Sequence, residues 1–577
     1  MSSFNGLLGV SPVAKGYQFA VWAPNAKAVA VTGTFNGWND NGTALNATDG
    51  GVWYGCIDNA ENGQEYKFII TTRQDERLVK NDPRARKLTN SVGNSVIYDD
   101  DFPWEHSPFK APPIHERVIY EMHIGTFHKP KDGHGTFATA IEKLPELKKL
   151  GINIIELMPV NEFAGDISWG YNPAYPYAVE EAYGGPDGLK EFIDAAHGLG
   201  MGVVLDVVYN HLGPSDLDIW QFDGWQENDK GGIYFYNDYR SATPWGDTRP
   251  DYGRQEVRDY LTDNALMWVN EFHADGLRMD MVPYMRSVSG ADNGEDDIPE
   301  AYDLIRTINQ QVHQAHPDKM TIAEDLHSHE YITNPVEEGG CGYTSQWAAG
   351  FVHPIRDALT KTEDSYVDLN TVASSVTNII SNNPFARVVY TESHDEVANG
   401  QARLVEEVAP GNVDDNYYAR QKGILAGVLV LTSVGVPMLF QGQDFKESGW
   451  FDDSHDIDWE RKERFAEYAQ AFATLMALRT NSNGNSAALT GGTAEIIHQD
   501  DEHKVLGFKR TNGLDDKAVY VFINLSGSDT EQYRLNNIPP DAQCLFGWQD
   551  GLTTDSVSLN DNMIHMTPYS AFIFSGS

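Results

Sequence analysis

From residue 118 onwards, short apolar runs alternate with longer stretches of helical periodicity, and this alternation constrains the fold more than any other feature of the sequence. The run at 118–124 is followed by 136–150, where apolar residues recur at the spacing of one helix face. The next apolar run, 152–160, precedes a second helical stretch at 188–199. Apolar strands separated by helices are typical of a parallel sheet that is buried on both faces.

The same alternation continues to residue 440. We expect further strands at 202–209, 276–281, 319–324, 386–391 and 434–440, with a weaker sixth strand at 342–347. Eight strand–helix units over about 350 residues fit a closed (β/α)8 TIM barrel. The chain is too long for one ordinary domain, so we expect other domains beside the barrel.

Both ends of the chain carry a different pattern, which is typical of antiparallel sheets. Short runs that alternate apolar and polar residues are separated there by turn residues such as asparagine and glycine. We therefore expect an N-terminal β-sandwich at 1–110, a barrel at 111–486 and a C-terminal all-β sandwich at 487–577. The barrel would carry a small aromatic, glycine-rich insert at about 212–255, over its active face.

The chain is strongly acidic, with 84 Asp and Glu against 42 Lys and Arg, for a net charge of −42. Because the acids are dispersed, we interpret them as a solvated surface, which argues against nucleic acid or an anionic membrane as a partner and is consistent with a neutral substrate. No run approaches the roughly 20 apolar residues of a membrane span. The first residues lack the pattern of a signal peptide, so we expect a cytoplasmic location.

Polar residues stand where four of the predicted barrel strands end, and barrel enzymes carry their active sites at that face. The third, fourth, fifth and seventh strands end in DVVYNH, GLRMD, AED and ESHDE. Arg278 and Asp280 lie two apart, so their side chains leave the same face of a strand. A positive charge favours the ionised form of a neighbouring carboxylate, and an ionised carboxylate is the nucleophile that attack on a sugar carbon requires. An isolated Arg-x-Asp would instead indicate a structural ion pair.

These four motifs, in this order and spacing, resemble the four ordered sequence regions of the α-amylase family, glycoside hydrolase family 13. The segment FAVWAPNAKAVAVTGTFNGW resembles the glycogen-binding-type module that precedes the barrel in branching enzymes, isoamylases and trehalohydrolases. The resemblance covers nearly the whole chain. It implies an α-glucan substrate such as starch, glycogen or maltooligosaccharides.

The resemblance also implies three catalytic carboxylates. Asp280 would be the nucleophile that forms a covalent glucosyl enzyme, and Glu324 would be the general acid that then becomes the base. Asp395 would grip the ring hydroxyls of the sugar in the −1 subsite. The acid of such a pair needs a raised pKa, and we expect crowding of Glu324 between Asp280 and Asp395 to raise it.

Further residues would bind or orient the substrate, again by resemblance. His211 and His394 would hydrogen-bond the sugar hydroxyls, Arg278 would orient Asp280 and Asp206 would support the cluster. The ring of Tyr171, in WGYN, would be the platform under the −1 sugar. Asn210 stands where many amylases bind calcium through a side-chain oxygen. Relatives that share the N-terminal module often lack that ion, so no cofactor is expected, and Asn210 is the candidate ligand where calcium binds.

The motifs leave several reactions open. YGRQEVRDYLTDNALMW, GYTSQWAAGFVHPI and SHDEVANG resemble glycogen branching enzymes, whereas VIYEMHIGTFHKPKDGHGTF and YAVEEAYGGPDGLK resemble maltooligosyltrehalose trehalohydrolases. We expect an α-1,4-glucan hydrolase that releases maltooligosaccharides, with a branching transglycosylase as the alternative and a trehalohydrolase third. A non-catalytic glucan-binding protein on the same fold is the hypothesis from a different class, and the retention of all three carboxylates argues against it.

Overall fold

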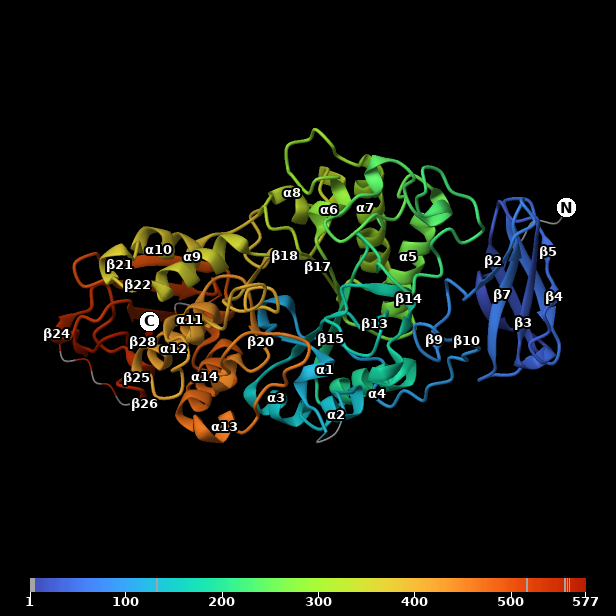
Figure 1. Cartoon of the computed structure of the whole chain (residues 1–577). Helices are drawn as coiled ribbons and strands as arrows, with labels where there is room; N and C mark the ends of the chain where they lie inside the picture. The colour runs from blue at the N-terminus through green and yellow to red at the C-terminus, as the bar shows by residue number, and fades with distance from the viewer. Residues whose placement is uncertain are drawn as a thin grey trace.

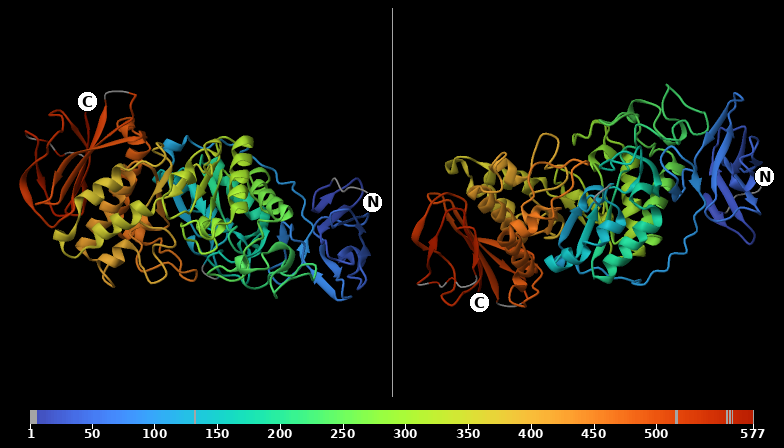
Figure 2. Two further views of the ribbon diagram at one scale, coloured as in Figure 1. Left: turned by 90° about the horizontal axis from the view of Figure 1, so that it is seen from above. Right: turned by 60° about the horizontal axis from the view of Figure 1, so that its bottom comes forward.

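The computed structural model describes residues 6–130, 133–514, 517–554, 557, 559 and 561–576. Three parts follow one another along the molecule (Figures 1 and 2): antiparallel sheets at the N-terminal end, a central barrel, and antiparallel sheets at the C-terminal end. None of the described helices is both long enough and apolar enough to cross a bilayer.

Eight parallel strands form the closed barrel and are hydrogen-bonded in chain order, with the eighth paired to the first. Each lies within the range expected from the sequence, the weak sixth strand included, so the predicted barrel is confirmed. The strands are β11 (Ile119–Met122), β12 (Ile154–Leu157), β15 (Gly202–Val207), β16 (Gly276–Met279), β17 (Met320–Ala323), β18 (Ser345–Trp347), β19 (Arg387–Val389) and β20 (Val436–Phe440).

Helices connect these strands. The longer ones are α4 (Gly185–Gly198), α5 (Gln255–Asn270), α7 (Pro299–Ala315), α9 (Ala349–Thr360), α10 (Leu369–Thr377), α12 (Tyr417–Thr432) and α14 (Ala466–Arg479). Shorter ones are α1 (Ile124–Phe127), α2 (Phe137–Ile141), α3 (Leu144–Leu150), α6 (Val282–Arg286), α8 (Glu330–Thr333), α11 (Leu404–Val408) and α13 (Arg461–Arg464). The single helix expected at 136–150 is therefore two. Pro145 stands in the first turn of α3, where its missing N–H costs nothing, and it would interrupt a continuous helix.

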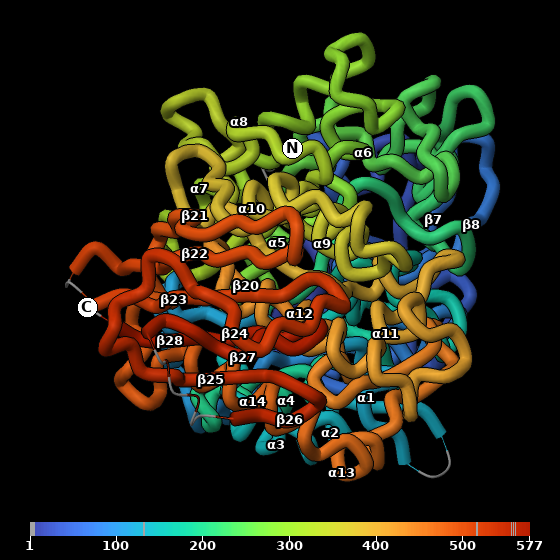
Figure 3. Tube along the Cα trace, turned by 90° about the vertical axis from the view of Figure 1, so that its left-hand side faces the viewer, coloured from blue at the N-terminus to red at the C-terminus, as the bar shows by residue number. Residues whose placement is uncertain are grey.

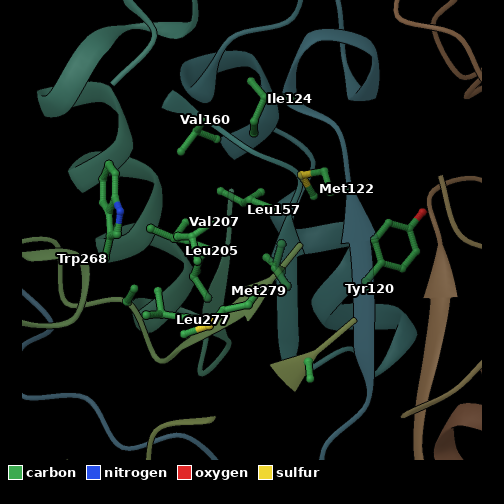
Figure 4. Packing of buried hydrophobic residues seen from close by; sticks show 14 of the residues in the cluster. Tyr120, Met122, Ile124, Leu157, Val160, Leu205, Val207, Trp268, Leu277 and Met279 are labelled. Carbon is green, nitrogen blue, oxygen red and sulfur yellow. The ribbon is translucent and has the colours of Figure 1, made fainter. Parts of the chain in front are cut away.

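Side chains alternate along each barrel strand between the surrounding helices and the barrel interior. Leu157, Leu205 and Leu277 belong to the cluster that packs against helix residues such as Trp268 of α5 (Figure 4). A separate cluster fills the interior near the starts of the strands, and its members include Ile119, Ile154, Val204 and Ile322. Two residues further along each of these four strands, on the same face, stands an acid. The barrel is thus apolar at its base and polar towards its mouth. The four acids are Glu121, Glu156, Asp206 and Glu324.

The N-terminal sheets have the strand orders β1-β2-β6-β5 and β4-β3-β7-β10-β9, with β8 paired to β7. Phe19, Val31 and Phe68 lie in their buried core. The strands are β1 (Gly9–Pro12), β2 (Tyr17–Trp22), β3 (Ala28–Gly33), β4 (Thr43–Ala44), β5 (Asn46–Ala47), β6 (Val52–Ile57), β7 (Glu65–Thr71), β8 (Arg77–Lys80), β9 (Lys87–Leu88) and β10 (Ser95–Val96).

The C-terminal sheets have the order β21-β22-β23-β28-β25-β26 and a separate β24-β27 pair. The larger sheet packs against α10 and α14 of the barrel (Figure 3). Antiparallel sheets at both ends agree with the fold expected from the sequence. The strands are β21 (Thr493–Asp500), β22 (Val505–Thr511), β23 (Ala518–Asn524), β24 (Thr530–Arg534), β25 (Gln543–Gln549), β26 (Leu552–Thr554), β27 (Met563–Met566) and β28 (Ala571–Gly576).

Two connections in the first half of the barrel, after β12 and after β15, are longer than a simple strand–helix turn. A buried hairpin of β13 (Asn161–Phe163) and β14 (Pro173–Val179), which the sequence analysis did not predict, follows β12. The insert at 212–255 contains short 3-10 turns, at Gly232–Tyr234 and Tyr239–Ser241, and two isolated bridges, and it ends where α5 begins.

This insert also contacts the N-terminal sheets. Asn25 donates its backbone N–H to Asp223 Oδ2 at 2.8 Å. Trp22 packs edge-on against Tyr234, with ring centroids 5.5 Å apart. The insert therefore joins the N-terminal sheets to the barrel.

Candidate active site

Arg278 is the centre of the polar layer and pairs with three carboxylates. Its Nη1 lies 2.6 Å from Asp206 Oδ2 and 3.2 Å from Asp280 Oδ1, and its Nη2 lies 2.8 Å from Glu324 Oε2. All four side chains are buried. Trp347 covers the guanidinium, with its ring centroid 4.3 Å from Arg278 Cζ. The structure thus brings together four residues that the sequence placed at the ends of three different strands.

Asn210 holds the carboxylate of Asp280. Its Nδ2 donates to Asp280 Oδ2 at 2.7 Å and to the Asp280 carbonyl oxygen at 2.9 Å. Burial raises the pKa of Asp280, while Arg278 and Asn210 lower it. The expectation that the arginine holds this carboxylate ionised is therefore incomplete, because desolvation acts in the opposite direction. The Asn210 oxygen faces His211 Nδ1, so in this geometry it is used within the site and is not turned outward as a calcium ligand.

Glu324 is held by the residue that follows Asp280. Met281 donates its backbone N–H to Glu324 Oε2 at 2.8 Å, and its φ of 37° and ψ of 56° lie in the left-handed region, which is uncommon for a residue with a side chain. Burial raises the pKa of Glu324 to about 7, with Arg278 opposing the rise and Asp280 adding to it. The direction agrees with the expectation from the sequence. The leading cause is burial, however, and not crowding by Asp395.

Asp395 is not one of the carboxylates that pair with Arg278. It is exposed, and its Oδ1 accepts a hydrogen bond from Asn399 Nδ2 at 2.9 Å. Among the described residues, no hydrogen bond or ion pair joins it to Asp280 or Glu324. Its neighbour in the chain, His394, is buried. Asp395 is therefore accessible to a bound molecule and does not belong to the buried ion-pair network.

Tyr171 and His394 form a stacked pair beside this network. Their ring centroids are 4.9 Å apart with an interplanar angle of 27°, and the Tyr171 hydroxyl donates to Asp206 Oδ2 at 2.6 Å. His394 contacts both carboxylate oxygens of Glu121, one through Nδ1 and the other through its backbone N–H at 3.0 Å. Burial lowers the pKa of His394, but Glu121 outweighs it, so the net shift is upward. Tyr171 remains half-buried, so part of its ring is accessible.

Both ring nitrogens of His211 contact protein groups. Nε2 lies 2.8 Å from the Tyr171 carbonyl oxygen, and Nδ1 lies against Asn210 Oδ1. Burial lowers the pKa of His211 to about 4. Trp245 of the insert stacks on this ring at 4.6 Å and contacts Tyr284 at 5.2 Å. In this geometry His211 positions Asn210 and Tyr171, and its expected hydrogen bond to a sugar would require one of these contacts to change.

Two buried acids of the barrel interior were missed in the sequence. Glu121 of β11 and Glu156 of β12 are direct partners in the parallel register. Burial raises the pKa of Glu156 well above its ordinary range, and Glu121 adds to the rise. The sequence feature that could have revealed them is a single glutamate within each of the apolar runs IYEM and IIEL. Such a residue must face the barrel interior when it stands two positions after an inward apolar residue.

One group of side chains in the described part of the chain has the spacing of metal ligands. Glu105, His106 and Asp194 have ligand atoms within 4.8 Å of one another. They lie on α4 and on the segment that leads into the barrel, outside the layer around Arg278. His106 Nδ1 and Asp194 Oδ2 already contact each other at 3.0 Å, which docks that segment on the helix.

Comparisons with known proteins identify the family of the chain. Residues 126–221 and 214–526 match the family described as Alpha amylase, catalytic domain, and residues 7–85 match Carbohydrate-binding module 48 (Isoamylase N-terminal domain). The chain is 33% identical to the 1,4-alpha-glucan branching enzyme GlgB of Corynebacterium jeikeium, over 96% of this chain and 78% of that protein. It is 32% identical to the protein of the same name from Oceanobacillus iheyensis, over 77% of this chain and 71% of the relative.

Solved structures share the fold at lower identity. The Group B Streptococcus pullulanase SAP superposes with a TM-score of 0.78 and 18% identity, covering 100% of this chain and 88% of that one. The pullulanase from Bacillus acidopullulyticus superposes with a TM-score of 0.78 and 20% identity. The match covers 100% of this chain and 75% of that one. The fold and the family matches together define an enzyme that acts on glycosidic bonds and is built around a (β/α)8 barrel. The chain belongs to the α-amylase family.

Proposed function

We propose that this chain is a 1,4-α-glucan branching enzyme, which cleaves an α-1,4 bond and transfers the released segment to a 6-hydroxyl of a glucan. The observation that carries the proposal is the similarity to the branching enzyme of Corynebacterium jeikeium, at 33% identity over 96% of this chain. This similarity favours the alternative of the sequence analysis over its first preference, a maltooligosaccharide-releasing hydrolase. The substrate would be a neutral α-glucan.

In the first step, a carboxylate oxygen of Asp280 attacks the anomeric carbon of the −1 sugar. The bond from that carbon to the glycosidic oxygen breaks, and Glu324 gives its proton to the departing oxygen. A Glu324 pKa of about 7 keeps a large fraction of this acid protonated at neutral pH. Arg278, which contacts both carboxylates, stabilises the negative charge of Asp280 before the attack and the charge that appears on Glu324 as its proton leaves.

In the second step, the 6-hydroxyl of an acceptor glucan attacks the same carbon. Glu324, now ionised, takes the hydroxyl proton, and the bond to Asp280 breaks, so both residues return to their starting states with retained configuration. Tyr171 and Asp395 are the half-buried and exposed members of the site, and we assign them the contacts to the −1 sugar. Asp206 and His394 hold Tyr171 in place.

The test is incubation with amylose while proton NMR follows reducing ends and α-1,6 linkages in one sample. A branching enzyme forms α-1,6 linkages with few net reducing ends. A rise in reducing ends without α-1,6 signals would mean a hydrolase and would overturn the proposal. If neither signal changes, maltooligosyltrehalose is the next substrate, and its hydrolysis would identify a trehalohydrolase.

Two variants test the assigned roles. Asp280→Asn and Glu324→Gln keep the size of each side chain, so both should abolish turnover and retain glucan binding. Unchanged activity in both variants would contradict the mechanism, whereas a wild-type chain that binds glucan without any turnover would indicate a non-catalytic glucan-binding role.

A further inference from the structure

A tight turn follows Asp395 in the loop between β19 and α11. Gln401 donates its backbone N–H to the Ala398 carbonyl oxygen at 2.9 Å. The two residues between them, Asn399 and Gly400, have φ angles of 55° and 95°, which fit a type I′ turn. Asparagine followed by glycine is a favoured pair for this turn, so the backbone conformation explains why both residues stand here.

The side chain of Asn399 contacts the candidate active site. Its Nδ2 donates to Asp395 Oδ1 at 2.9 Å, and both residues are exposed. An amide nitrogen can donate this hydrogen bond, whereas an ionised carboxylate has only acceptors. The contact therefore depends on the side-chain nitrogen of Asn399.

An asparagine that precedes a glycine can react with its own backbone. The backbone nitrogen of Gly400 attacks the side-chain carbonyl carbon of Asn399, and the new C–N bond closes a five-membered succinimide. The side-chain nitrogen leaves as ammonia and takes up the proton of the attacking N–H. Water then opens the ring at either carbonyl, which leaves an aspartate or an isoaspartate at this position. Glycine favours the closure because it has no Cβ, and at Gly400 no atom lies within 4 Å of the place where a Cβ would stand.

The hydrogen bonds of the two reacting groups distinguish this pair from the other Asn-Gly pairs that the structure describes. Among the described residues, neither the Gly400 N–H nor Asn399 Oδ1 has a hydrogen-bond partner. In each of the other pairs, either a backbone carbonyl accepts from the glycine N–H or the asparagine Oδ1 accepts from the residue two positions on. The glycines held in this way are Gly37, Gly42, Gly63 and Gly484, and the asparagines are Asn293 and Asn512. Ring closure requires the two groups to approach each other, so Asn399–Gly400 is the pair least restrained against it.

We propose that Asn399 is a site of spontaneous deamidation, and that this modification inactivates the enzyme with time. The product carries a carboxyl group that is ionised at neutral pH, so it cannot donate to Asp395. It also places a second negative charge where the hydrogen-bond donor was, and the two charges repel each other. Asp395 then loses the orientation in which it meets the −1 sugar. The inference rests on the proposed function only in assigning Asp395 to that sugar.

The tryptic peptide 388–403 reports the modification directly, because Asn399 is the single asparagine within it. The full wild-type chain is held at a mildly alkaline pH, which promotes attack by the backbone nitrogen. Mass spectrometry of this peptide and turnover of amylose are followed in the same samples. The fraction of the peptide in which the amide has become an acid should rise as the activity falls, with one time constant for both.

Three variants separate the chemistry from general inactivation. Asn399→Asp should begin with kcat/KM on amylose about tenfold below the wild type, the scale of one hydrogen bond to a charged group. Asn399→Gln keeps an amide, but its ring closure would be six-membered and slower, so its activity should stay constant under the same conditions. Asn483→Asp is the matched control, since Asn483 is exposed in the loop after α14 and also precedes a glycine. It should leave kcat/KM unchanged.

The outcomes separate this inference from the proposed function. An intact peptide in a chain that has lost its activity would overturn the proposal, and so would a modified peptide in a chain of undiminished activity. Decline of Asn399→Gln at the wild-type rate would assign the loss to another process. A chain without turnover from the beginning would contradict the proposed function instead, and the peptide would still decide whether Asn399 deamidates. Whether the turnover is branching or hydrolysis does not enter the comparison, because either reaction needs Asp395 at the −1 sugar.

Discussion

At the scale of single residues, one guanidinium determines how the site divides its protons. Arg278 faces Asp206, Asp280 and Glu324, so one positive charge compensates three buried acids. Burial raises the pKa of Asp206 to about 6 and that of Glu324 to about 7, with Arg278 opposing both shifts. The excess of acid over base means that part of the cluster holds a proton at neutral pH. A retaining mechanism needs this division, with one carboxyl as acid and another as nucleophile.

The raised pKa of Glu324 predicts the alkaline limb of the pH profile. The acid must carry its proton in the first step, so kcat/KM should fall about tenfold per pH unit above about pH 7. The measurement is kcat/KM on amylose from about pH 5 to about pH 9. An aryl maltooligosaccharide has a leaving group that departs without a proton. The rate of its glycosylation step should therefore not fall above about pH 7. A rate that stays level to about pH 9 would contradict the assignment of Glu324 as the acid.

The same shift has a consequence for stability with a definite sign. Because the folded pKa of Glu324 is raised, its contribution to stability is complete below the unfolded pKa of about 4.3 and is lost as pH rises through about 7. Glu324→Gln cannot ionise, so the variant should gain stability relative to the wild type above about pH 7 and not below about pH 4. The measurement is the unfolding temperature of both proteins above about pH 7 and below about pH 4. The lower pH is the control, because both proteins carry an uncharged side chain at residue 324 there.

At the scale of elements, three arginines fasten the end of α12 to its surroundings. The carbonyls of residues 432–435 accept hydrogen bonds in succession: the first two from Arg510 of β22, the third from Arg387 of β19 and the fourth from Arg479 of α14. Burial lowers the pKa of all three guanidinium groups. The carboxyl end of a helix attracts cations, which helps to compensate their desolvation. Arg510 is therefore one of the links between the C-terminal sheet and the barrel.

Arg510→Met should destabilise the protein by about 3 kcal/mol, because it leaves several buried carbonyl groups without donors. Arg534→Met is the matched control, since Arg534 is exposed on β24 of the same C-terminal part and should change stability little. Denaturant unfolding of the two variants gives the comparison. Equal stability of Arg510→Met and the wild type would show that water or other donors replace the arginine.

The sequence predicted the barrel strands because a parallel strand buried on both faces is apolar over its whole length, which is a local property. It did not predict β14, because Pro173 and Pro176 interrupt the strand pattern, and prolines are tolerated there by an irregular pairing with β13. For the site, spacing alone predicted that Arg278 and Asp280 leave the same face of one strand, and their roles came from the resemblance. The exposure of Asp395 depends on how its loop folds, which spacing does not determine.

At the scale of the whole molecule, the insert contacts both the N-terminal sheets and the mouth of the barrel. One end of it contacts those sheets through Asp223 and Tyr234, and another part places Trp245 on His211. The side chain of Arg86, which directly precedes β9 of these sheets, forms a two-point ion pair with Glu271 beyond α5, at 2.9 Å and 2.7 Å. The sequence showed the insert and its aromatic residues. It did not show that the insert packs between two parts of the chain, because no local pattern encodes such a contact.

The net charge of −42 predicts how salt affects the stability of the whole chain. Folding brings dispersed acids closer together, so their repulsion opposes the compact state, and the Debye length falls from about 30 Å at 0.01 M salt to about 3 Å at 1 M. We therefore predict that the unfolding temperature rises by a few degrees with NaCl over about this range, while binding of a neutral maltooligosaccharide changes little. Sucrose at matched osmolality controls for general exclusion effects. A fall in the unfolding temperature with salt would mean that attractive pairs such as Arg86–Glu271 outweigh the repulsion, because screening weakens both.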